Sequence, residues 1–79
     1  MKGRYIVRDR YIVFGNRLND ALENRGMKQK QLAACLGVDQ ITVSRWVCGV
    51  TMPNVEHLKK IVDTLNVSVD YLFGREVEE

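Results

Sequence analysis

Apolar residues recur every three or four positions along most of the chain, and this is the spacing of one face of an α-helix. In the first such stretch, Phe14, Leu18 and Leu22 follow one another at intervals of four, and Gly26 is suited to end the helix. The pattern predicts five helices, over residues 11–25, 28–36, 40–48, 55–65 and 69–73. We therefore expect an all-α domain, a bundle of five short helices with tight connections.

The residues between the predicted helices support these boundaries. Asp39, Asn54 and Ser68 each precede a helix and carry a side-chain oxygen that can accept hydrogen bonds from the first free N–H groups. Gly37 separates the second helix from the third, where the turn is expected to need a positive φ. Asn66 can adopt the left-handed conformation at the end of the fourth helix.

The first ten residues do not fit the helical pattern. The tetrapeptide Arg-Tyr-Ile-Val begins at Arg4 and again at Arg10, and its β-branched residues also suit a strand. Two copies are too few for a repeat architecture, so the repetition is either coincidental or part of a strand-capable arm. We expect an N-terminal arm over 1–10, the helical domain over 11–74 and a tail over 75–79.

Charge is distributed unevenly along the chain. Twelve Lys and Arg residues against ten Asp and Glu give a net charge of only +2, but the arm holds four basic residues and one acidic residue. The tail holds one basic residue and three acidic residues. The basic end is thus the better candidate to face phosphates, although two solvated tails fit the pattern equally well.

The remaining composition excludes several classes of protein. Cys35 and Cys48 are too few for a disulfide framework, and with His57 as the single histidine they do not make a metal site. We interpret both cysteines as reduced, small apolar side chains. The chain shows neither an apolar run of membrane-spanning length nor a signal peptide. We expect a cytoplasmic protein without cofactor, metal, small-molecule ligand or membrane contact.

The stretch 29–48 combines two helices around a glycine and indicates a helix-turn-helix. Ala33 is small enough for two helices to cross closely there. An apolar wedge is expected to fix the angle between the helices, and it consists of Leu32, Leu36, Val38, Val43 and Trp46. The side chains left over on the third helix are small, polar or cationic, as a surface that lies against base edges requires; they are Gln40, Ile41, Thr42, Ser44 and Arg45.

From about Phe14 to Gly74 the chain resembles the phage repressor and Cro family of helix-turn-helix proteins. The resemblance rests on motifs in family order, which are Arg17-Leu18, Gln29, Leu32-Ala33, Thr42-Val-Ser-Arg-Trp46, Gly49, Pro53 and Asp70-Tyr-Leu-Phe-Gly74. It implies a five-helix lambda-repressor-like domain that binds double-stranded DNA. It also implies a transcriptional regulator, in most cases a repressor, that binds a palindromic operator as a homodimer.

The resemblance assigns roles to individual residues. The base contacts in the major groove fall on Gln40, Ile41, Ser44 and Arg45. The phosphate contacts fall on Gln29, Lys28, Thr42 and Arg17. Independently of the resemblance, the last helix and the tail are our candidates for the dimer contact, with Val69, Leu72 and Phe73. Arm contacts to the duplex are a hypothesis for Lys2, Arg4, Arg8 and Arg10.

The chain also departs from the family pattern. Lys28 replaces the usual Ser or Thr cap of the second helix, and Leu22 and Val47 replace an Arg–Glu pair. The exit from the third helix, residues 48–52, has no Lys or Arg, where relatives often carry them. We therefore expect weak binding to phosphates, with a shallow salt dependence, unless the arm compensates. A disordered tail or a dimer-contact strand are the alternatives for the arm.

Two other classes of function are weaker fits. An antitoxin-like module that sequesters a partner protein would need a longer partner-binding tail than the five residues after Gly74. An enzyme is not expected, since no nucleophile–base pair, catalytic carboxylate pair or Gly-rich phosphate loop is present. Either a complete small repressor or a fragment of a longer regulator is compatible with this sequence.

Overall fold

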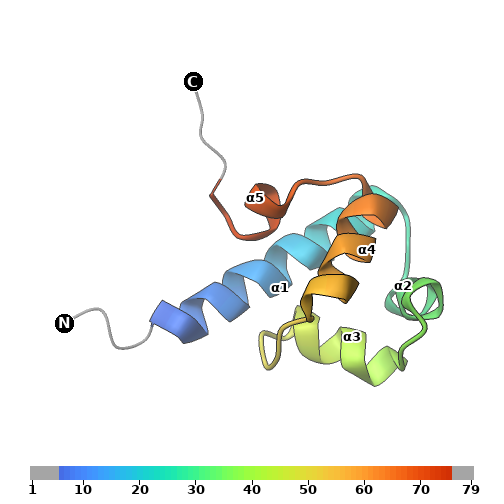
Figure 1. The fold of residues 1–79 in the computed structure, drawn as a ribbon, viewed down its shortest axis with the longest axis horizontal. Helices are drawn as coiled ribbons and strands as arrows, with labels where there is room; N and C mark the ends of the chain where they lie inside the picture. The colour runs from blue at the N-terminus through green and yellow to red at the C-terminus, as the bar shows by residue number, and fades with distance from the viewer. Residues whose placement is uncertain (1–5, 76–79) are drawn as a thin grey trace.

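The computed structural model describes residues 6–75, with side chains from residue 10 onward. Within this range the chain forms helices and no strand, which confirms the predicted all-α fold class. The helices are α1 (Ile6–Asn24), α2 (Gln29–Leu36), α3 (Gln40–Val47), α4 (Val55–Leu65) and α5 (Val69–Leu72). Figure 1 shows α1 as the longest helix, with α3 along one side of it, α5 along the other, and α2 beyond the end of α3.

Helix α1 begins at Ile6, five residues earlier than we expected. The backbone of residues 6–10, which we expected in an arm, is therefore helical. β-Branched residues lower helix propensity by only tenths of a kcal/mol each, roughly up to 0.7, so a packed helix can extend through them. Lys2 and Arg4 lie outside the described residues, as does the side chain of Arg8. Although α1 has 19 residues, no helix in the described range is long and apolar enough to cross a membrane.

Every helix contributes to one hydrophobic core. The buried side chains are Phe14, Leu18, Ala21, Leu22, Leu32, Ala33, Leu36, Val43, Trp46, Ile61, Leu65 and Leu72. Burying one large apolar side chain contributes about 1.5–3 kcal/mol, so this core is the main source of stability. Both cysteines lie outside this core: Cys35 and Cys48 are exposed, and neither forms a disulfide.

Most predicted helix ends agree with the structure. Asn54 Oδ1 accepts a hydrogen bond from the His57 N–H at 2.8 Å, and Ser68 Oγ accepts one from the Tyr71 N–H at 2.9 Å. Gly37 and Asn66 adopt the left-handed conformation, with φ of 74° and 57°. Asp39 differs, because it occupies the N-cap position of α3 but its side chain accepts no capping hydrogen bond.

Candidate nucleic-acid interface

Helices α2 and α3 form one compact unit around Gly37. Four of the five residues of the predicted wedge are buried, and these are Leu32, Leu36, Val43 and Trp46. The fifth, Val38, is half-buried against the same core, and Ala33 is buried beside them. The turn is closed by a hydrogen bond from the Val38 N–H to the Ala33 carbonyl at 3.0 Å. Because a small residue stands at this crossing, the two helix backbones approach closely and the angle between them is fixed.

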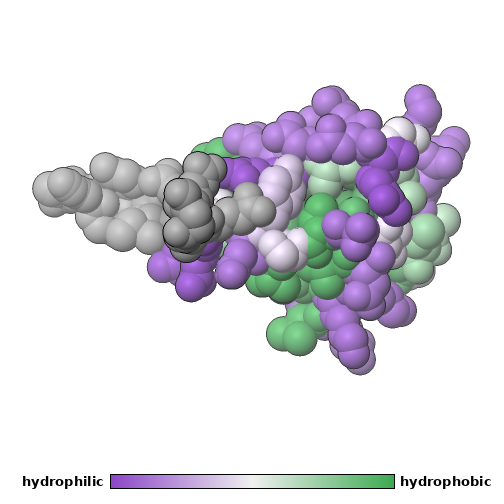
Figure 2. All heavy atoms as spheres, turned by 90° about the horizontal axis from the view of Figure 1, so that it is seen from above, coloured by the Kyte–Doolittle hydropathy of each residue, from purple (hydrophilic) through white to green (hydrophobic). Residues whose placement is uncertain are grey.

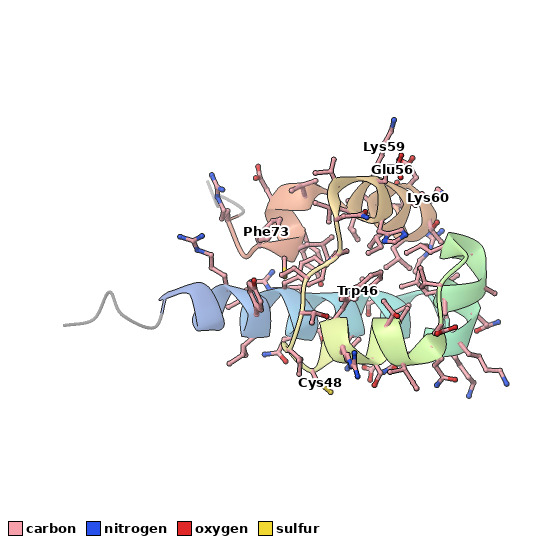
Figure 3. All side chains as sticks on the ribbon, turned by 60° about the horizontal axis from the view of Figure 1, so that its bottom comes forward. Trp46, Cys48, Glu56, Lys59, Lys60 and Phe73 are labelled. Carbon is pink, nitrogen blue, oxygen red and sulfur yellow. The ribbon has the colours of Figure 1, made fainter. Side chains whose placement is uncertain are left out.

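The buried side of α3 determines which side chains it presents outward. Val43 and Trp46 face the core, and in Figure 3 Trp46 lies in the interior while α3 runs along the outer edge of the molecule. Gln40 and Arg45 are exposed, and Ile41 is 64% exposed. Ser44, half-buried, follows Gln40 by one turn. The predicted base contacts therefore form two neighbouring rows on one outward face, since residues four apart are stacked along a helix.

That outward face extends to the end of the helix. Cys48, the C-terminal cap of α3, is exposed and follows Ser44 by four positions, so it continues the same row. Its N–H donates to the Ser44 carbonyl at 2.9 Å. Thr42 is half-buried beside the row, on the flank of the face. The surface contains hydrogen-bonding, cationic and apolar groups within a short length of helix.

The predicted phosphate contacts on α2 lie at its N-terminus. Gln29 is the first helical residue and is half-buried, and Lys28 is the exposed N-cap. Gln31 Oε1 accepts a hydrogen bond from the Lys28 N–H at 2.7 Å. The Lys28 side chain has no acceptor, so the reciprocal bond of a capping box is not available and no side chain caps the first turn. The N–H groups at such an end suit an anion.

Arg17, a predicted phosphate contact, points to a different side of the molecule. Its guanidinium carbon lies 5.1 Å from the centroid of the Tyr71 ring in α5. Gly15 faces α3, and two residues along a helix turn by about 200°, so Arg17 lies on the opposite side of α1. The structure thus does not bring Arg17 together with the exposed face of α3.

Arg10 lies on the same side of α1 as Arg17, because seven residues make about two turns. It lines a hollow of about 480 Å³ together with Phe73 and Arg75. Arg10 therefore belongs to the α1–α5 side of the molecule and is not part of a separate arm.

The three predicted dimer residues have different environments. Leu72 is 0% exposed and belongs to the core, which corrects its assignment to a surface that a second subunit can reach. Val69 is 42% exposed. Phe73 is half-buried, with its ring centroid 5.6 Å from that of Phe14. Figure 2, which views the molecule from the side of α4 and α5, shows apolar residues in the middle of this face, among hydrophilic ones.

The segment that leaves α3 carries no charge between Cys48 and Asn54. Val50 is 61% exposed, and its N–H donates to the Arg45 carbonyl at 2.9 Å. The nearest cations along the chain on the C-terminal side are Lys59 and Lys60. Figure 3 shows both on the side of the molecule opposite α3, near Glu56. They do not supplement the exposed face of α3.

Gly15 is a residue of this region that sequence reasoning missed. It lies in the middle of α1, is buried, and faces the end of α3. A Cβ atom at this position would lie 2.7 Å from the Trp46 carbonyl oxygen and closer still to that of Val47. The available signal was a glycine inside an otherwise helical stretch, which often marks a close approach of two backbones.

Comparison with known proteins gives consistent matches. The sequence model of the helix-turn-helix family matches residues 18–72. The HTH-type transcriptional activator BcrR of Enterococcus faecalis is 33% identical over 63 residues, which are 80% of this chain and 31% of that protein. The HTH-type transcriptional regulator ImmR of Bacillus subtilis (strain 168) is 32% identical over 62 residues, 78% of this chain and 49% of that protein. The chain thus spans half or less of the length of these relatives. No solved structure matches the chain significantly.

Proposed function

Because the chain belongs to the helix-turn-helix family of phage repressor and Cro type, a family of DNA-binding transcriptional regulators and not of enzymes, we propose that it reads a specific operator with α3 in the major groove. The observation that carries this proposal is the outward face of α3, where Gln40, Ile41 and Arg45 are exposed while Val43 and Trp46 fix the helix to the core. A major groove about 12 Å wide admits one α-helix.

Each exposed side chain on this face has a chemical counterpart on a base edge. Gln40 can pair with N6 and N7 of adenine, and Arg45 with O6 and N7 of guanine or with a phosphate. Ile41 can contact the methyl group of thymine, which would bury an apolar side chain that is 64% exposed in the free protein. A well-made bidentate contact discriminates against the wrong base by about 1–3 kcal/mol.

Contacts to the DNA backbone come from fewer groups. We assign them to Gln29 and Lys28 at the N-terminus of α2 and to Thr42 on the flank of α3. The uncharged segment after Cys48 adds no cation. Because each neutralised phosphate contributes about −0.9 to the slope of log K against log salt concentration, we expect a shallow slope.

We further propose that two copies bind a palindromic operator. One recognition helix covers only a few base pairs, and a two-fold dimer places two such helices about one helical turn of DNA apart. The candidates for the contact are the exposed Val69 and the half-buried Phe73, at the two ends of α5. We propose repression, in which the bound dimer occludes a promoter. One relative is named as an activator, so a reporter assay should be able to detect both a decrease and an increase in expression from the promoter.

Selection of bound sites from random DNA at near-physiological salt tests this function. The wild-type protein should enrich a palindrome with two half-sites. Arg45→Ala should relax selection at one base pair in each half-site. Lys59→Ala removes the same charge from the opposite side of the molecule and should leave the selected sequence unchanged. Flat enrichment by the wild-type protein, or equal effects of the two variants, would overturn the proposal.

A further inference from the structure

Helices α1 and α3 touch at one point without any side chain between them. Gly15 of α1 is buried there, and a Cβ atom on it would lie 2.7 Å from the Trp46 carbonyl oxygen and 2.9 Å from the Val47 carbonyl carbon. Atoms at ordinary van der Waals distance are about 3.5–4.0 Å apart. The α-carbon of Gly15 therefore faces the last carbonyl groups of α3 directly.

A second glycine contact lies at the same end of α3. Gly49 follows the helix with a φ of 78°, and a Cβ atom on it would lie 3.2 Å from both Cα and Cγ1 of Ile12. Ile12 precedes Gly15 by three residues, or about one turn of α1. The carboxyl end of α3 and the chain that leaves it thus both rest on the backbone of α1.

The carbonyl groups at a helix end have no donor within the helix. The Trp46 carbonyl accepts a hydrogen bond from the Gly49 N–H at 3.1 Å. The Val47 carbonyl accepts none of the backbone hydrogen bonds that the described residues form outside helices. Its neighbour is the α-carbon of Gly15, whose C–H groups are weak donors. A side chain at position 15 would remove this contact and displace the helix end.

We propose that Gly15 is a positioning residue for DNA reading, an inference that rests on the function proposed above. By allowing backbone contact at one end of α3, it sets the tilt at which the exposed face of the helix meets the major groove. At about 1.5 Å per residue, the eight residues of α3 are about 12 Å long. A displacement of about 1 Å at the carboxyl end, with the other end held by α2, is a tilt of about 5°.

The displacement is unequal along the helix. Arg45 lies in the last turn, close to the carbonyl groups that would move, whereas Gln40 begins the helix beside α2. Hydrogen bonds between nitrogen and oxygen occupy a range of only about 2.7–3.2 Å, so a shift approaching 1 Å breaks them. A side chain at position 15 should therefore disturb the base pair read by Arg45 more than the one read by Gln40.

Binding of Gly15→Ala to the selected operator, and to operators changed at single base pairs, tests this role at a temperature where the variant is folded. We expect at least about tenfold weaker operator binding and a loss of discrimination at the Arg45 base pair, with discrimination at the Gln40 base pair kept. Asn16→Ala is the matched control, since it places an alanine at the neighbouring, exposed position, and it should bind the operator with wild-type affinity. Val62→Ala, in half-buried surroundings on α4, should lower stability without changing either discrimination ratio.

If Gly15→Ala does not fold, Gly49→Ala replaces it, because its Cβ would press on Ile12 at the same end of α3. We expect the same selective loss at the Arg45 base pair. Wild-type-like affinity and discrimination in the folded variant, or equal losses at both base pairs, would overturn the positioning role alone. If the wild-type protein selects no operator, both the proposed function and this inference are wrong.

Discussion

Replacing Leu72 with alanine separates the two roles that α5 can play, in the core of one subunit and in a contact between two. Leu72 is 0% exposed, and the substitution removes three buried carbon atoms. At about 0.8 kcal/mol for each buried CH₂ group the loss is about 2.4 kcal/mol, and the cavity left behind adds to it. Because α5 has only four residues and can partly collapse onto α1, we expect a total near 3 kcal/mol.

For a domain of this size, 3 kcal/mol corresponds to a decrease in Tm of roughly 12–24 °C. Thermal unfolding followed by circular dichroism at two protein concentrations measures it, and the decrease should be the same at both. Val69→Ala is the matched variant on the same helix, since Val69 is 42% exposed. It should change Tm little but weaken self-association in sedimentation. A Leu72→Ala protein with a wild-type Tm and weakened self-association would show that this leucine acts in the dimer and not in the core.

Two further substitutions test the remaining assignments. Lys28→Ser supplies the side-chain acceptor that the N-terminus of α2 lacks, so it should stabilise the fold by about 0.5–1 kcal/mol and raise Tm. Because it also removes a positive charge, operator binding should become weaker and less dependent on salt. An unchanged Tm would contradict the capping argument. Arg17→Ala removes the contact with Tyr71 and should cost about 0.5–1 kcal/mol of stability, measured by denaturant unfolding, without changing the salt slope of DNA binding. A shallower slope would mean that Arg17 reaches a phosphate after all.

Features that depend on neighbouring residues were predictable from the sequence. Asn54 and Ser68 cap their helices through the N–H group three residues later, so both partners are visible in the sequence. The exposed face of α3 was predictable for a related reason. Val43 and Trp46 are three residues apart and must face inward together, and this leaves Gln40, Ser44 and the residues beside them outside.

Features that depend on which helix covers which side of α1 were not predictable. The sequence shows that α1 has apolar residues at helical spacing, but it does not show which helix covers them. In the structure, α3 packs on one side of α1 and α5 on another. Arg17 therefore looked available to DNA and instead lies over Tyr71, and Leu72 looked available to a second subunit and instead completes the core. Gly15 gave only a general signal, because its role depends on two carbonyl groups about thirty residues away in the chain.

The uncharged segment between Cys48 and Asn54 has a consequence for how the protein searches a genome. Attraction to phosphates is independent of sequence, so every cation beside the recognition helix lengthens the time spent on non-operator DNA. A protein with few such cations dissociates quickly from non-operator DNA, and its residence time on the operator depends on base contacts. Competing sites in a genome number about 10⁶–10⁹, and the ratio of specific to non-specific affinity then decides how much of the protein occupies its operator. Under the function proposed above, and if the basic residues 2–10 add no phosphate contact, that ratio is set mainly by the side chains on the outward face of α3.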